Sequence, residues 1–238
     1  MSKARKRYNN QDNVVNFNQS LIHNPKHIHL KPKTRNQEQL ILNLLDPSQH
    51  IVMASGPAGT GKTYLAMLAA IKALKSGLCE RIVLTRPAVG VEDERHGFLP
   101  GDLISKMEPW TRPLLDVLRE YYSPRDILAM MEDQIVEISP LAYMRGRTFK
   151  HSWIIADEMQ NATPGQMKML LSRIGENSKI VVTGDVEQAD RSAKENGLLD
   201  VVHRLKQKGG DGIAVCHLGK RDIQRHPIID TVLELYAE

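Results

Sequence analysis

GPAGTGKT, residues 56–63, follows a short apolar run at 51–55 and opens an amphipathic segment at 63–76. A strand, a glycine-rich turn and a helix in this order match the phosphate-binding pattern G-x-x-x-x-G-K-[S/T]. Gly59 and Gly61 allow a tight turn whose N–H groups point inward, and the helix N-terminus adds its positive dipole. The pattern predicts a loop for the phosphates of ATP or GTP. Its residues are Gly56, Pro57, Ala58, Gly59, Thr60, Gly61, Lys62 and Thr63.

Short apolar runs recur along the rest of the chain, with helical segments between them. They occupy residues 51–55, 81–85, 135–139, 153–157, 179–183 and 212–216. Near-continuous apolar runs are typical of strands buried on both faces of a parallel sheet. The alternation predicts a doubly wound α/β sheet flanked by helices. Residues 99–131, helical but interrupted by prolines, are expected to pack against that sheet.

Acidic and polar residues end two of the predicted strands. Asp157 and Glu158 close the run at 153–157, a position from which Asp157 can complete a Mg²⁺ shell together with Thr63. Glu158, one residue further, can polarise water against the γ-phosphate, while Lys62 is expected to reach the β- and γ-phosphates. Thr183, Asp185 and Gln188 follow another strand and are either γ-phosphate sensors or parts of a capped turn.

Charge is distributed unevenly along the chain. Residues 1–35 carry eight Lys or Arg and one acid, whereas the remaining 203 residues carry 24 basic and 27 acidic groups. We expect 1–33 to be an extended basic arm, able to hold nucleic-acid phosphates or serving only as a solubilising tail, and 34–238 to be one core domain. The longest apolar run has eight residues, 64–71, which predicts a cytoplasmic protein without a membrane span. Cys79 and Cys216 are expected to be reduced thiols.

The sequence resembles the PhoH family of P-loop ATPases, whose core is similar to that of superfamily-one helicases. The resemblance runs from about residue 33 to 236 and rests on short sequence motifs that occur in a fixed order. They are GPAGTGKTYLA at 56–66, LTRPAV at 84–89, GFLPGDL at 97–103, LAYMRGRTF at 141–149, DEMQNATPGQMKM at 157–169, VVTGDVEQAD at 181–190 and RHP at 225–227. The segment at 90–96 and Met159 depart from the usual family pattern. Longer relatives carry an additional domain, so this sequence resembles the core-only members common in bacteriophages, which would place it in the host cytoplasm.

The resemblance implies a single RecA-like P-loop NTPase domain and a role for several further residues. Gln37, or Gln39 in a shifted register, corresponds to a glutamine that reads adenine. Gln160 and Gln188 correspond to γ-phosphate contacts. Arg86 corresponds to a strand-end motif that faces nucleic acid, and Arg225 is a candidate arginine finger.

These expectations together predict a Mg²⁺-dependent ATPase. A superfamily-one helicase closes two such cores around ATP, whereas this sequence holds one. We therefore expect copies to form a head-to-tail ring, a hexamer, in which Arg225 enters the site of the neighbouring copy. The ring would act on RNA or single-stranded DNA, with Arg86, Arg145 and Arg147 contacting backbone phosphates. The alternatives are a ring ATPase that acts on protein partners and a small-molecule kinase. The kinase is disfavoured because the glutamate and the Thr-Gly-Asp motif indicate water as the acceptor.

Overall fold

A six-stranded parallel sheet, in the order β3-β2-β4-β5-β1-β6, forms the centre of the molecule. The computed structural model describes residues 27–87, 103–186, 196–226 and 228–235. The strands are β1 (Ile51–Ser55), β2 (Arg81–Thr85), β3 (Val136–Ile138), β4 (Ser152–Ala156), β5 (Lys179–Gly184) and β6 (Ile213–His217). Every residue of β1 and β4 is buried, as the continuous apolar runs predict.

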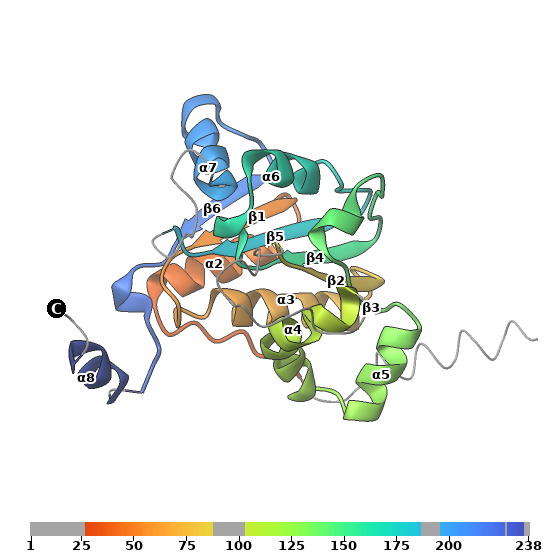
Figure 1. Ribbon diagram of the computed structural model, residues 1–238, viewed down its shortest axis with the longest axis horizontal. Helices are drawn as coiled ribbons and strands as arrows, with labels where there is room; N and C mark the ends of the chain where they lie inside the picture. The colour runs from red at the N-terminus through yellow and green to blue at the C-terminus, as the bar shows by residue number, and fades with distance from the viewer. Residues whose placement is uncertain (1–26, 88–102, 187–195, 227, 236–238) are drawn as a thin grey trace, which may run out of the picture.

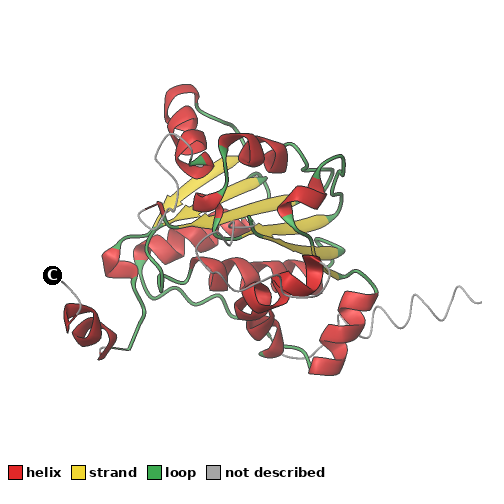
Figure 2. Ribbon diagram, viewed as in Figure 1, coloured by secondary structure: helices red, strands yellow, loops and turns green. Residues whose placement is uncertain are grey.

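Helices cover both faces of this sheet (Figures 1 and 2). They are α2 (Arg35–Leu45), α3 (Lys62–Lys75), α4 (Leu103–Arg119), α5 (Pro124–Glu132), α6 (Pro164–Leu171) and α7 (Gly197–Lys208). Helix α8 (Ile228–Leu235) lies apart from the sheet in Figure 1. Two apolar clusters result, one between the sheet and α2, α3, α4 and α5, the other between the sheet and α6 and α7. The predicted doubly wound α/β domain is confirmed.

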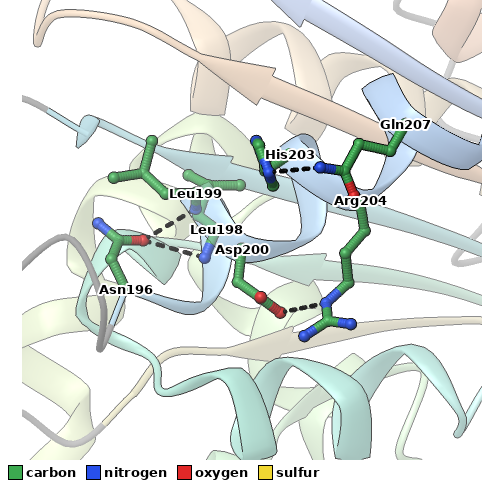
Figure 3. Close-up of polar contacts among 7 residues, drawn as sticks. All are labelled: Asn196, Leu198, Leu199, Asp200, His203, Arg204 and Gln207. Carbon is green, nitrogen blue, oxygen red and sulfur yellow. Dashed lines mark hydrogen bonds and ion pairs between the residues drawn. The ribbon is translucent and has the colours of Figure 1, made fainter.

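Local sequence explains where the helices begin. Thr34 caps α2 by accepting a hydrogen bond from the Gln37 N–H, and Thr163 with Gln166 forms a capping box at α6. Asn196 caps α7, since its Oδ1 accepts from the N–H groups of Leu198 and Leu199 at 3.0 and 3.1 Å (Figure 3). These caps fix where α6 and α7 begin, beside the strand ends that carry the polar motifs.

The sequence-based element boundaries agree closely with the structure. The predicted helix at 63–76 is α3, and the stretch at 99–131 contains α4 and α5, with 99–102 outside the described residues. Most of the predicted arm, 1–26, also lies outside them, and 27–32 has no helix or strand. Both cysteines are free and buried. Within the described ranges, no helix is both long and apolar enough to cross a bilayer.

Candidate functional site: a phosphate-binding loop at the carboxyl edge of the sheet

The strand order brings the predicted motifs together. β5 lies between β1 and β4, so the loop after β1, the acids after β4 and the polar cluster after β5 meet at one edge. They line a hollow of about 260 Å³ together with the first turn of α3. Its lining residues are Ala58, Gly59, Gly61, Lys62, Thr63, Tyr64, Asp157, Glu158, Gly184 and Asp185.

The phosphate-binding loop is held from outside by the strand end of β6. Gly56 has φ 144°, and a β-carbon there would lie 2.0 Å from the carbonyl oxygen of Leu218. Inside the loop, the Thr60 hydroxyl donates to the Pro57 carbonyl at 2.8 Å and Thr60 is fully buried. Position 56 therefore has room only for glycine, because the backbone at Leu218 of the same chain passes in direct contact with it.

Lys62 is a buried cation at the centre of the site. Its Nζ donates to the carbonyl oxygens of Gly56 and Pro57 at 2.6 and 2.8 Å. Burial lowers the pKa of Lys62, and the carboxylates of Asp185, Glu158 and Asp157 oppose that shift. The ammonium is thus surrounded by acceptors, which is the environment that phosphate oxygens would also provide.

Asp157 is the point at which three motifs join. Its Oδ1 accepts hydrogen bonds from the hydroxyls of Thr63, at 2.8 Å, and of Thr183, at 2.5 Å. A hydroxyl and a carboxylate are hard oxygen ligands of the kind that Mg²⁺ prefers, so the residues fit this ion. Among the described residues no cluster of three or more His, Cys, Asp or Glu forms a metal site of its own.

Glu158 is held in place by Gln160. Its backbone adopts the left-handed conformation (φ 55°, ψ 36°), a cost of about 1–2 kcal/mol that is typically retained at functional sites. The Nε2 of Gln160 donates to Glu158 Oε2 at 2.5 Å, and its Oε1 accepts from the Asp185 N–H at 3.1 Å. Gln160 is only 2% exposed, so it links the β4 and β5 ends from behind the site.

Arg225 lies on the phosphate-binding loop of its own chain. Its Nη2 donates to the Ala58 carbonyl at 2.8 Å, and the Gln224 N–H donates to the Gly59 carbonyl at the same distance. These bonds, with the close approach of Leu218 to Gly56, hold the segment after β6 beside the loop of its own chain. The entry of Arg225 into a neighbouring copy's site stays a prediction.

Gln37, not Gln39, is the glutamine that contacts the loop. Gln37 is buried, its Nε2 donates to the Thr60 carbonyl at 3.1 Å and its Oε1 accepts from the Lys33 N–H at 2.8 Å. Gln39 instead donates to Asn43 on the exposed side of α2. The structure thus places the α2 N-terminus against the loop.

The three arginines expected to contact nucleic acid lie in different surroundings. Arg86 directly follows β2 and is partly exposed, and Arg145 is exposed beside the start of α6. Arg147 forms a two-fold ion pair with Glu137, with Nη2 to Oε2 at 2.9 Å, and stacks on the Phe149 ring. Its charge is therefore neutralised within the fold, whereas the structure leaves Arg86 and Arg145 at the surface.

One predicted site residue, Gln188, lies outside the described residues. The structure also shows contacts that the sequence analysis did not predict. Tyr64 lines the hollow and donates to Glu120 at 3.1 Å, a place that its position directly after Thr63 could have indicated. The bond between Asn36 and Asp222, 2.8 Å long, joins segments 186 residues apart, and no local pattern predicts it.

Comparison with known proteins identifies relatives of this chain. A family model described as "PhoH-like protein" matches residues 29–237. A "PhoH-like protein" of Synechocystis sp. is 44% identical over 87% of this chain, and one of Bacillus subtilis is 43% identical over 92%. The chain spans 62% and 68% of these two relatives. The large terminase from a thermophilic bacteriophage superposes with a TM-score of 0.54 at 9% identity, covering 87% of this chain and 51% of that chain, and shows the fold alone.

Proposed function

Because the chain belongs to the PhoH-like protein family, we propose that it is a Mg²⁺-dependent ATPase whose assembled copies remodel RNA or single-stranded DNA. The observation that carries the proposal is the junction of Thr63, Asp157 and Thr183 at the mouth of the phosphate-binding loop. It joins the loop, the acid that ends β4 and the polar end of β5. These three parts are the ones that phosphoryl transfer to water requires.

Nucleotide binding would begin with Lys62 and the N–H groups of the loop. Lys62 exchanges the carbonyl oxygens of Gly56 and Pro57 for phosphate oxygens, which carry more negative charge. Thr63 and Asp157 would hold Mg²⁺, which would neutralise charge at the phosphates when bound. Gln37, from its place against Thr60, is positioned to carry the adenine contact that the family resemblance implies.

We assign to Glu158 the activation of the water that attacks the γ-phosphate. Its carboxylate accepts the water's proton or orients the water, and Gln160 fixes its direction by hydrogen bonding to the same carboxylate. Because Gln160 also accepts from the Asp185 N–H, a change at the end of β5 reaches Glu158 through one side chain. Gln160 is thus a positioning residue, and Gln188 stays a proposed γ-phosphate contact.

Arg225 contributes positive charge from its own chain in this proposal. Its Nη2 lies 2.8 Å from the carbonyl oxygen of Ala58, which itself lines the hollow. A shift of its flexible side chain would bring the guanidinium to the phosphates without a neighbouring copy. An arginine at this place stabilises charge that develops in the transition state.

Nucleic acid would contact the edge of the sheet through Arg86 and Arg145. Arg145 borders a second hollow of about 450 Å³ beside the first turn of α6. One core holds one such edge, so a ring of copies, for which we propose a hexamer, would provide a continuous track. The ion pair of Arg147 with Glu137 removes one cation from this edge and favours the second candidate, a ring ATPase that acts on protein partners.

The test is steady-state ATP hydrolysis with and without single-stranded RNA and DNA at two salt concentrations. Stimulation that falls as salt rises supports a nucleic-acid track, because phosphate contacts release counterions. Turnover that is indifferent to both favours a protein partner. Lys62→Ala should abolish hydrolysis, while Lys208→Ala on the exposed side of α7 is the matched control and should retain it. Hydrolysis that persists in Lys62→Ala would refute the site.

A further inference from the structure

A buried carboxylate, that of Asp222, lies between the two segments that close around the phosphate-binding loop. Asp222 ends the short helical turn η4 (Lys220–Asp222) and is only 2% exposed. It is not among the residues that line the hollow at the loop, so the chemistry proposed above does not use it directly. Burying a carboxylate is costly unless hydrogen bonds satisfy it, and a fully satisfied buried network makes the surrounding structure rigid.

The start of α2 is bound to Asp222 by two side chains. The Asn36 Nδ2 donates to Asp222 Oδ2 at 2.8 Å, and the Thr34 hydroxyl also donates to this carboxylate. The Thr34 oxygen in turn accepts from the Gln37 N–H at 3.3 Å. The backbone of Gln37 is therefore joined to Asp222 through one hydroxyl, while its side chain donates to Thr60 of the loop.

The same carboxylate closes the turn that leads to Arg225. The Gly219 N–H donates to Asp222 Oδ2 at 2.6 Å. This turn lies between Leu218 and Gln224, which both contact the phosphate-binding loop. Because Asp222 fixes the turn, it also fixes the point from which the Arg225 side chain extends.

The surroundings of Asp222 favour its ionised form. Burial opposes the charge, but hydrogen bonds from Asn36, Thr34 and Gly219 outweigh it and hold the pKa of Asp222 below its usual value. Hydrogen bonds to an ionised acceptor are roughly twice as strong as those between neutral groups. One carboxylate therefore holds both segments at neutral pH.

We propose that Asp222 is a positioning residue that holds Gln37 and Arg225 in one frame around the bound nucleotide. Gln37 lies where the base is expected and Arg225 lies toward the phosphates, so a displacement on either side reaches the other through Asp222. A misplacement of about 1 Å can lower a rate by about 10²-fold. This inference rests on the roles in ATP hydrolysis proposed above for Gln37 and Arg225, and it does not depend on assembly of copies.

Double variants test the proposal by ATP hydrolysis and by equilibrium binding of a fluorescent ATP analogue. Asp222→Ala alone should lower kcat by about 10²-fold and weaken nucleotide binding by up to about tenfold. In an Arg225→Ala chain it should lower kcat by less than about two-fold further, because the residue that it positions is already absent. In a Gln37→Ala chain it should weaken binding by less than about two-fold further.

Asn36→Ala provides a variant that leaves the buried carboxylate in place. Asn36 is exposed, and its truncation removes one of the hydrogen bonds to Asp222. It should produce the same pattern at smaller size, with faster hydrogen exchange in the first turn of α2 before nucleotide is added. Gln207→Ala is the matched control, because Gln207 is an exposed amide on α7 that hydrogen-bonds to His203 at 2.8 Å (Figure 3). It should change neither activity nor exchange.

Full additivity in the double variants would overturn the positioning role, since a merely structural loss adds to the other two. Unchanged kcat and binding in Asp222→Ala would overturn it as well. An unaltered chain that does not hydrolyse ATP, or hydrolysis that persists in Lys62→Ala, would instead overturn the proposed function. Urea unfolding establishes that each variant is folded under the assay conditions. If Asp222→Ala does not fold, Asn36→Ala in the same two backgrounds decides between additive and non-additive losses.

Discussion

Arg225 lies so close to Gly59 of the phosphate-binding loop that a β-carbon on Gly59 would be 2.5 Å from the Arg225 Nε. The same side chain donates to the Ala58 carbonyl. An arginine near the C-terminal end of the sequence therefore packs against the phosphate-binding loop of its own chain. The contact ties the C-terminal segment to the phosphate-binding loop within one chain.

Arg225→Ala should lower kcat by about 10²- to 10³-fold, the usual effect of removing one group that stabilises transition-state charge. If Arg225 acts within its own chain, as proposed above, a mixture of Arg225→Ala and Lys62→Ala chains should remain inactive. Recovery of hydrolysis in that mixture would show that the arginine acts across copies. Arg204→Ala is the control, since Arg204 pairs only with Asp200 on the exposed face of α7 among the contacts drawn in Figure 3.

Gly56→Ala should destabilise the fold far more than Gly77→Ala. Both glycines have positive φ, 144° and 71°, but a β-carbon at position 56 meets the Leu218 carbonyl whereas one at position 77 meets open space. We expect a loss of about 1 kcal/mol in the free energy of unfolding for Gly77→Ala. For Gly56→Ala we expect ~3 kcal/mol or more. Urea unfolding measures both, and equal losses would contradict the close approach.

Glu158→Gln should lower kcat by about 10²- to 10⁴-fold, as expected for removal of a general base. The amide keeps the shape of the side chain, so nucleotide affinity should change little. Single-turnover hydrolysis and equilibrium binding of a fluorescent ATP analogue separate the two effects. Glu132→Gln, at an exposed position on α5, should leave both unchanged. An equal loss of binding and turnover would assign Glu158 a structural role.

Arg147→Ala should lower stability without changing nucleic-acid binding, and Arg145→Ala should weaken binding without changing stability. Removing Arg147 leaves Glu137, whose side chain is 16% exposed, without its partner, and should cost about 1 kcal/mol of stability. Affinity for single-stranded nucleic acid should not change. Removing Arg145 should leave stability unchanged and reduce the salt dependence of binding by about one phosphate contact. Binding titrations at several salt concentrations check both, and a weaker salt dependence for Arg147→Ala would contradict the prediction.

Both thiols should resist modification in the folded protein. Burial raises the pKa of Cys79 to about 12 and also raises that of Cys216. The reactive thiolate is therefore scarce at pH 8, and neither sulfur is readily accessible. Ellman's reagent should label the folded chain slowly and the urea-unfolded chain at two thiols. Rapid labelling of one thiol without urea would show that its site opens locally.

The strands and the central motifs could be predicted from sequence because their signals are local. The apolar runs at 51–55 and 153–157 are continuous, and strands of that kind are buried on both faces. Asp157 and Glu158 directly follow one of them, so their place at the sheet edge follows from strand direction. The same reasoning did not foresee the pairing of Arg147 with Glu137, because this ion pair joins a strand to a loop after η1 (Leu141–Met144).

The parallel sheet, the phosphate-binding loop and the acid that follows β4 could be read from the chain without coordinates, since each depends on neighbours within a few residues. The closing of Arg225 and Gln37 around the loop, and the joining of Thr63 to Thr183 by Asp157, are contacts between segments far apart in sequence. Those contacts depend on β5 lying between β1 and β4 and on β6 passing beside the loop. The strand order is set by packing both faces of the whole sheet at once, and no short stretch of sequence encodes it.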